Sequence, residues 1–260
     1  MSLFGNPSAA LRSERGFTLI ELLVSMAMGI IIILAAFSLL DFTTRDVSRI
    51  TSRAQVDQTG RVALEKLMLQ LHSSCVAPTV NPIQPGGNEN VLKFISESSP
   101  LNTYKEPVSS LSTVRLREIV YTPASGKTEG TLTEKSWPST GTSPNYVFDE
   151  KAAPTERKLL TGVTQTASEP VFRYYRYYRE GDTGAKLGQI NPNPVAVPLE
   201  KELESEIISK VTVSFTLAPE GQESAFAKGD RAVALEDSAI LRLAPSSEAS
   251  SNPNYPCSQT

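Results

Sequence analysis

The chain has 260 residues and a formal net charge of −3, with hydrophobic residues at 40% and charged residues at 20%. This length suits one medium domain or two small ones, and the small net charge gives no general attraction to nucleic acid or anionic lipid. There are one histidine, His72, and two cysteines, Cys75 and Cys257, with no CxxC pair. These counts speak against a zinc site and a histidine-based catalytic site, so we expect no metal, no cofactor and no enzyme activity.

The first feature along the chain is an apolar segment from Phe17 to Leu40, which follows a short polar leader with Arg12 and Arg15. As a helix this segment is about 36 Å long, enough to cross the roughly 30 Å hydrocarbon core of a bilayer. A secretory signal peptide is the competing interpretation. The segment is long for a signal peptide and no A-x-A cleavage pattern follows it, so we interpret it as a retained transmembrane helix.

Glu21 is the only charged side chain in this apolar segment. A carboxylate near the centre of a bilayer costs about 2–4 kcal/mol on insertion scales. Glu21 lies close to the start of the segment, where it can reach the lipid headgroups in a monomer. In a packed bundle of such helices it would be dry and would need a cation.

The helical pattern continues beyond the apolar segment as far as Cys75. Apolar residues recur there at helical spacing: Val47, Ile50, Ala54, Leu64, Met68 and Leu71. This pattern predicts one long helix that is amphipathic in its second half. Gly60 is a weak point that such a helix tolerates.

The run Gly16-Phe17-Thr18-Leu19-Ile20-Glu21, with the apolar segment and the amphipathic helix after it, resembles the type IV prepilin signal. The resemblance implies that prepilin peptidase cleaves after Gly16 and methylates the new amino terminus, Phe17, while the apolar segment is kept. It also implies that the amino terminus of an adjacent subunit supplies the cation for Glu21; the alternative is a carboxylate that reaches the headgroups without a partner. The chain is long for a major pilin and has no proline between Phe17 and Val76, which favours a minor pilin or pseudopilin.

The remainder of the chain predicts a β-rich domain. Runs of β-forming residues follow a loop rich in Pro, Gly and Asn: Val91–Ile95, Val114–Tyr121, Val171–Tyr178, Ile207–Leu217 and Ala232–Leu243. In the fourth run apolar and polar residues alternate from Val211 to Leu217, which is typical of a half-buried strand. We expect the polar stretch from Thr122 to about Ala153 to be a surface loop with one short strand near Tyr146–Phe148.

These elements predict an α+β fold of the type IV pilin kind, with the long N-terminal helix packed on an antiparallel β-sheet. The expected segments are a prepilin leader at 1–16, a transmembrane and filament-core helix at 17–40, its amphipathic continuation at 41–75 and an exported globular domain at 76–260. Arginines on both sides of the apolar segment leave the positive-inside rule undecided. The expectation that the C-terminal domain is exported therefore comes from the resemblance. In an oxidising compartment we expect Cys75 and Cys257 to form a disulfide.

The run FRYYRYYRE, from Phe172 to Glu180, has two interpretations. Arg173, Arg176 and Arg179 alternate with tyrosines, as in proteins that bind single-stranded nucleic acid through stacking and phosphate contacts. Tyrosine and phenylalanine are also common in strands, and acidic residues follow the run at once, which favours a structural role.

A second set of arginines, Arg45, Arg49 and Arg53, is spaced by four residues on one helix face. These side chains could contact phospholipid headgroups or acidic residues of a neighbouring subunit. They could equally form a solvated face with the nearby acidic residues Asp41, Asp46 and Asp57.

The sequence therefore predicts a structural subunit of a type IV pilus or a type II secretion-like filament. Before assembly it would cross the membrane once, with its C-terminal domain outside the cytoplasm. The expected partners are prepilin peptidase, other pilin or pseudopilin subunits and the inner-membrane assembly platform. The alternative is a DNA-binding minor pilin that acts in DNA uptake; the single histidine and the absence of catalytic motifs argue against a third class, a membrane-anchored enzyme.

Overall fold

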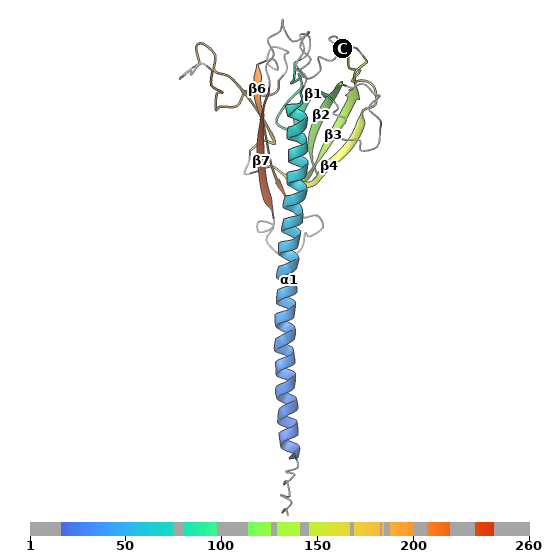
Figure 1. Ribbon diagram of the computed structural model, residues 1–260, viewed down its shortest axis with the longest axis vertical. Coiled ribbons are helices and arrows are strands. Elements are labelled where there is room, and N and C mark those ends of the chain that lie inside the picture. Colours follow the sequence, from blue (N-terminus) through green and yellow to red (C-terminus); the bar gives the residue numbers. More distant parts are fainter. Residues whose placement is uncertain are drawn as a thin grey trace, which may run out of the picture. The chain divides into compact units, whose positions relative to one another are not determined.

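A computed structural model describes residues 17–74, 81–97, 114–125, 129–140, 146–166, 169–182, 184, 188–199, 207–218 and 232–241. It contains one helix, α1 (Leu19–His72), and strands β1 (Val91–Glu97), β2 (Val114–Pro123), β3 (Gly130–Pro138), β4 (Thr155–Thr164), β5 (Phe172–Arg176), β6 (Ile208–Leu217) and β7 (Val233–Ile240) (Figure 1). The chain divides into two compact units, Met1–Ile50 and Thr51–Thr260. The predicted α+β fold, a long N-terminal helix with an antiparallel sheet, is confirmed.

The helical part of the first unit contains no proline, and its Leu, Met and Ala residues are strong helix formers. Its last turns carry ion pairs between neighbouring side chains, Arg45 with Asp41 at 2.7 Å and Arg49 with Asp46 at 3.6 Å. Such pairs, three or four residues apart, support a solvated helix by a few tenths of a kcal/mol each, about 0.2–0.5. The helix therefore continues without interruption from the apolar segment into a charged one.

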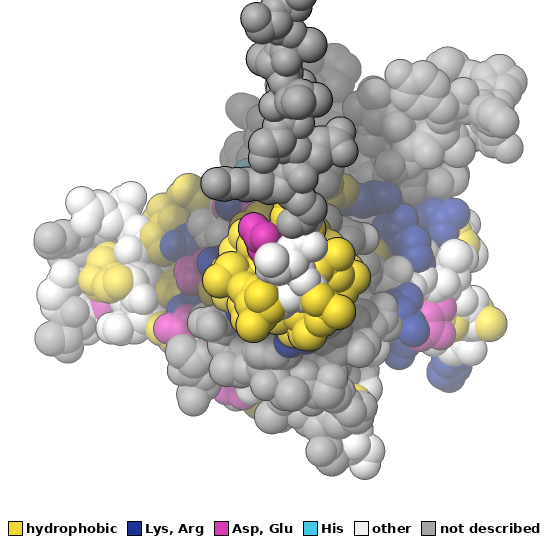
Figure 2. Space-filling view, turned by 90° about the horizontal axis from the view of Figure 1, so that it is seen from below, with side chains coloured by type: hydrophobic (Ala, Val, Ile, Leu, Met, Phe, Trp, Pro, Cys, Tyr) yellow, Lys and Arg dark blue, Asp and Glu magenta, His cyan; other side chains and the backbone are white. Residues whose placement is uncertain are grey.

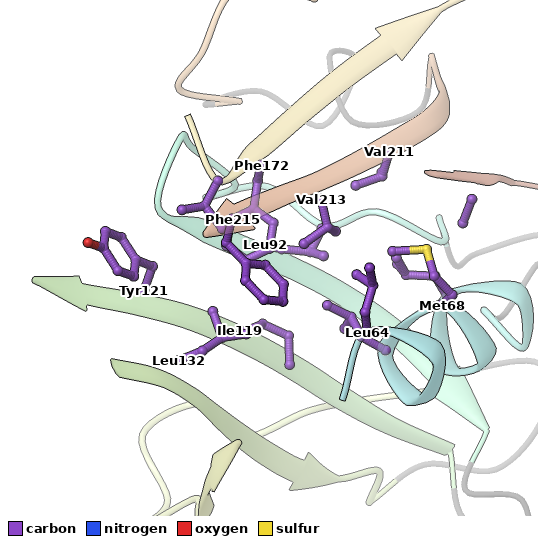
Figure 3. Close-up of a cluster of buried hydrophobic side chains, with 14 of the residues drawn as sticks. Leu64, Met68, Leu92, Ile119, Tyr121, Leu132, Phe172, Val211, Val213 and Phe215 are labelled. Carbon is purple, nitrogen blue, oxygen red and sulfur yellow. The ribbon is translucent and has the colours of Figure 1, made fainter. Parts of the chain in front are cut away.

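In the second unit, α1 buries one face against the sheet. The buried residues recur every three or four positions: Gly60, Leu64, Leu67, Met68 and Leu71. Figure 3 shows Leu64 and Met68 pointing from the helix toward Ile119 of β2 and Phe215 of β6. The prediction is thus confirmed for the second half of the apolar pattern. Val47 and Ile50 of the first unit, which share the helical spacing, are 62% and 70% exposed in the isolated chain.

The strands form one antiparallel sheet in the order β1-β2-β3-β4-β6-β5, with β7 paired to β6. The pairing of β4 with β6 is short, because only Val163 with Leu217 and Thr164 with Thr216 are in register. The sheet therefore consists of two well-paired parts, β1–β4 and β5–β7, which meet at the ends of β4 and β6. The main apolar core lies on the helix side of both parts.

A second, smaller cluster lies on the opposite side of β1–β3, where Ile95, Leu116 and Trp137 pack with Val114. The segment after β3 covers this cluster. Tyr146 and Phe148 pack against it, Phe148 forms a bridge with Ser139, and the indole Nε1 of Trp137 donates to the carbonyl of Ala152 at 2.9 Å. The short extended segment predicted near Tyr146–Phe148 is a single bridge in the structure.

Two predictions about the strands are wrong. The polar stretch from Thr122 to Ala153 is not one surface loop, because it contains β3, and β4 follows it. β6 is not half-buried, since Thr212 and Ser214 are 2% and 1% exposed. The sheet register places Thr212 beside Arg173 and Ser214 beside Glu236. Arg173 and Glu236 form an ion pair at 2.9 Å, which lies over this face of β6.

Candidate assembly site

The first turn of α1 is held by Thr18. Its side-chain Oγ1 accepts a hydrogen bond from the backbone N–H of Glu21 at 3.3 Å, and its carbonyl accepts from the N–H of Leu22 at 3.2 Å. Thr18 is therefore the N-cap of the helix. The spacing Thr-x-x-Glu is that of a capping box, so the sequence itself contains a helix-start signal that involves Glu21.

Glu21 lies in this first turn, and its side chain is exposed in the isolated chain. A carboxylate in the first turn is favoured by the partial positive charge of the helix N-terminus. Viewed along the helix, Figure 2 shows a ring of hydrophobic side chains with an acidic group at its rim. Phe17, the residue expected to become the amino terminus, lies four residues before Glu21 and is 79% exposed; Gly16 lies outside the described residues.

The apolar segment after Glu21 has no partner of its own within the described chain. Its most hydrophobic window has a mean hydropathy of 2.6, and 0% of that window is buried. The hydroxyl of Ser25 donates to the carbonyl of Leu22 at 2.9 Å, which satisfies this polar group inside the helix. So much exposed apolar surface is stable only in lipid or against other helices, and the helix fits a single-pass membrane anchor.

The arginine stripe that follows the span is partly neutralised by its own helix. Arg45 and Arg49 form the ion pairs with Asp41 and Asp46 described above, whereas Arg53 lies in the second unit. These contacts support the solvated, self-paired face as the interpretation of this stripe.

Two of the three arginines of the FRYYRYYRE run, Arg173 and Arg176, have side chains engaged in contacts within the fold. Arg173 forms ion pairs with Glu169 and Glu236, both at 2.9 Å, and Arg176 forms one with Asp182 at 2.7 Å. Phe172 and Tyr174 are buried, and Tyr175 is 8% exposed. Arg179 follows the strand, and its backbone N–H donates to Asp182 at 2.9 Å. The strand therefore uses these side chains for packing and pairing, which supports the structural interpretation.

The remaining candidate residues do not form a site in the described part of the chain. Cys75 and Cys257 lie outside the described residues, so the disulfide stays a prediction. His72 ends α1, where a basic side chain is favoured by the helix dipole. Among the described residues, no group of three His, Cys, Asp or Glu side chains is arranged to hold a metal ion.

Comparison with known families gives one match. Residues 11–37 match the family model described as the prokaryotic N-terminal methylation motif, which is the type IV prepilin signature. The matched stretch contains Arg12, Gly16, Phe17 and Glu21, together with most of the apolar segment. The comparisons with curated proteins and with solved structures found no match. The motif supports a type IV pilin or pseudopilin precursor that is processed by prepilin peptidase.

Proposed function

We propose that this chain is a minor pilin or pseudopilin, a structural subunit of a type IV pilus or a type II secretion-like filament. One combined observation carries the proposal. The chain matches the methylation motif, and the most hydrophobic window of its long apolar helix is 0% buried. A helix of this kind provides the contact surface for a helical filament core. The sheet domain then decorates or caps that core, and we propose no catalytic role for it.

The proposed assembly step depends on the start of the helix. Cleavage after Gly16 would free the α-amino group of Phe17 as an ammonium, and Glu21 of a neighbouring subunit would accept it in a dry contact. Capping by Thr18 supports this step, because it fixes the backbone of the turn from which the Glu21 side chain projects. Before assembly, the subunit would lie in the inner membrane with its sheet domain outside the cytoplasm, in contact with prepilin peptidase and the assembly platform.

Processing gives the first test of the proposed function. Amino-terminal sequencing of the protein extracted from membranes is expected to begin at Phe17, and mass spectrometry is expected to show one added methyl group on that residue. A chain that begins after Leu40 would have lost the apolar segment to a signal peptidase, which would overturn the proposal.

The filament system is identified by a deletion that is assayed in parallel for surface fibres, protein secretion and DNA uptake. Loss of fibres or of secretion is the expected outcome. Loss of DNA uptake with intact fibres would favour the alternative, a DNA-binding minor pilin. That alternative also requires DNA retention that falls with salt and with substitution of Arg173, Arg176 and Arg179.

The two cysteines give a further prediction for an exported domain. A Cys75–Cys257 disulfide would tie the C-terminal tail to the segment after α1, and closing a loop of this length stabilises by roughly 4–5 kcal/mol in the chain-entropy model. Non-reducing mass spectrometry of native material is expected to show the linked peptides. Two free thiols in that material would reject the bridge.

A further inference from the structure

Strand β7 is an outer strand of the sheet, and its backbone shows which of its groups face outward. It pairs with β6 over its whole length of 8 residues without a bulge. The N–H of Leu241, the residue after the strand, donates to the carbonyl of Ser209 at 2.8 Å. Because hydrogen-bonded pairs alternate along an antiparallel ladder, the odd-numbered residues of β7 bond to β6. The even-numbered residues direct their N–H and carbonyl groups away from the sheet: Ala234, Glu236, Ser238 and Ile240.

A hydrogen bond of β6 agrees with this alternation. Ser214 lies beside Glu236, and its N–H donates to the carbonyl of Val171 at 2.9 Å, on the side of β6 that faces away from β7. The pair of Ser214 and Glu236 is therefore not hydrogen-bonded, as the alternation requires. The outward backbone groups of Glu236 are thus directed to the outer edge of β7.

The other two outer strands have their outer edges covered by the chain itself. On β1, the N–H of Ile95 donates to the carbonyl of Pro82 at 3.0 Å. On β5, the carbonyl of Tyr174 accepts from the N–H of Val195 at 2.7 Å. In the described part of the chain, no residue outside β7 forms a hydrogen bond to the outward groups of this strand. The fold therefore closes two edges and leaves the edge of β7 open.

Asp237 makes the one described contact at the open edge. Its Oδ1 accepts from the outward N–H of Ser238 at 2.7 Å, and the residue is exposed. Two copies of β7 paired antiparallel along their length would bring Glu236 and Asp237 of both chains together, and like charges across a ladder are destabilising. Acidic side chains thus protect the edge against self-pairing, while they favour a strand with positive charge.

We propose that the outer edge of β7 pairs with an extended segment of a neighbouring filament subunit, and that this segment presents a lysine or arginine to Asp237. An added strand gains affinity from main-chain hydrogen bonds, and 8 residues provide an edge of about 27 Å. The cation of the partner takes the Asp237 carboxylate away from the N–H of Ser238 and so frees that donor for the ladder. The identity of the neighbour as a filament subunit rests on the proposed function; the open edge does not.

Hydrogen exchange of the backbone amides tests the pairing. It is measured by mass spectrometry on the full-length chain, in detergent and in sheared filaments. In detergent we expect slow exchange at Leu235 and Ala239, which bond to β6, and fast exchange at Glu236 and Ile240. In filaments the outward amides are expected to exchange about tenfold more slowly or less. The peptide that contains β1 is the internal control, since its outer edge is already covered, and its exchange should not change.

The same preparation separates failure of the inference from failure of the proposed function. Unchanged exchange of β7 in filaments that contain the chain would overturn the strand pairing and leave the proposed function intact. Absence of the chain from filaments would contradict the proposed function, and with it the neighbouring subunit as the partner.

Ser238→Pro tests the ladder, because it removes an outward N–H without removing a hydrogen bond to β6, and edge strands tolerate proline at such positions. We expect the amount of this variant in sheared filaments, relative to membranes, to fall several-fold, with a Tm in detergent close to that of the wild type. Ser238→Ala is the matched control, since it keeps the N–H, and it should enter filaments normally. Normal incorporation of Ser238→Pro would overturn the pairing; if this variant does not fold, the exchange measurement decides.

Asp237→Lys tests the charge of the partner. It reverses the exposed charge at the edge, so incorporation is expected to fall several-fold if the neighbouring segment is basic. Asp237→Asn, which removes the charge without reversing it, should show a smaller loss. Incorporation of Asp237→Lys at the level of the wild type would overturn the basic partner.

Discussion

Asp182 organises the turn that follows β5. Its carboxylate accepts hydrogen bonds from both terminal nitrogens of Arg176, at 2.7 and 2.9 Å, and from the backbone N–H of Arg179 at 2.9 Å. These bonds, with that of Arg176 the largest cause, favour the charged carboxylate and lower its pKa from 3.8 to about 2. The turn from Arg179 to Asp182 is therefore stabilised by one carboxylate.

This shift predicts a pH dependence of stability. Because the pKa is lower in the folded chain than in the unfolded one, the charged carboxylate stabilises the fold above pH 3.8, and its contribution is lost as the pH falls toward about 2. We expect Asp182→Asn to lower the Tm at pH 6 by roughly 1–2 °C and to weaken the dependence of the Tm on pH between 4 and 2. The measurement is thermal unfolding of both proteins across that range. Asp237→Asn serves as a control at an exposed aspartate of β7, and unchanged acid sensitivity in Asp182→Asn would contradict the assignment.

Two carboxylates, Glu21 and Glu134, differ in how far the sequence predicts them. Glu21 stands alone in an apolar run, so its position is visible without a structure. Glu134 lies in a polar run, and its partners Arg117 and Arg157 are 17 and 23 residues away. Only the register of β2, β3 and β4 brings these charges together, and register is not encoded by any short motif.

At the scale of elements, the sequence predicts α1 and the strands with clear apolar alternation but not β3 and β4. The strand GTLTEKSWP carries Leu132, Glu134 and Ser136 on its helix side and Trp137 on the other, so its apolar residues do not alternate. β4 begins with four exposed residues, TERK, and a bulge displaces its register against β3. In both strands, pairing with neighbours and neutralisation of buried charge decide the conformation, and tertiary context thus overrides local propensity.

The docking of α1 on the sheet depends on a close approach at Gly60. A Cβ atom added there would lie 2.4 Å from Cδ1 of Leu235 on β7 and 3.2 Å from Cδ2 of Leu217 on β6. The residue that the sequence marks as a weak point of the helix is therefore a point where the helix backbone comes close to side chains of the sheet.

We expect Gly60→Val to lower the free energy of unfolding by about 1–3 kcal/mol, because the added side chain overlaps with Leu235 in a packed core. The measurement is denaturant unfolding of the full chain in detergent. In a Leu235→Ala background the overlap is removed, so Gly60→Ala should become stabilising by up to about 1 kcal/mol through helix propensity alone. A neutral Gly60→Val, or no dependence on residue 235, would show that the helix packs differently.

At the scale of the whole molecule, the chain combines one unit that buries its own core with one that exposes its apolar side chains. The sheet unit has fully buried residues such as Phe94, Tyr174 and Phe215, each 0% exposed. The apolar part of α1 reaches a comparable burial only in a bilayer or among other helices. The exposed apolar part of the helix is visible in the sequence, because a long apolar run is the strongest one-dimensional signal a chain can carry. It does not predict which neighbours cover the helix, since these are not part of the chain.

The last prediction concerns Glu21 in the transfer of the helix from membrane to filament. Glu21→Gln keeps the size and the hydrogen-bonding capacity of the side chain but removes its charge, and Glu21→Ala removes both. Either change should favour membrane partition of the monomer, because a costly carboxylate is gone. In a filament, the Phe17 ammonium of the neighbour would lose its counter-charge, and an uncompensated buried charge costs about 3–5 kcal/mol. We therefore expect both variants to be depleted more than tenfold in sheared filaments relative to membranes, with cleavage after Gly16 unaffected.

Ser25→Ala is the matched control for this experiment. Ser25 lies one turn after Glu21 on the same face of the helix, and its hydroxyl is already satisfied by the carbonyl of Leu22. Its removal changes polarity without changing charge, so this variant should enter filaments like the wild type. If charge pairing is the role of Glu21, the Gln variant should fail nearly as badly as the Ala variant. Wild-type incorporation of both would show that the carboxylate only reaches the headgroups, and would place the subunit where no neighbouring amino terminus faces it, as at a filament tip.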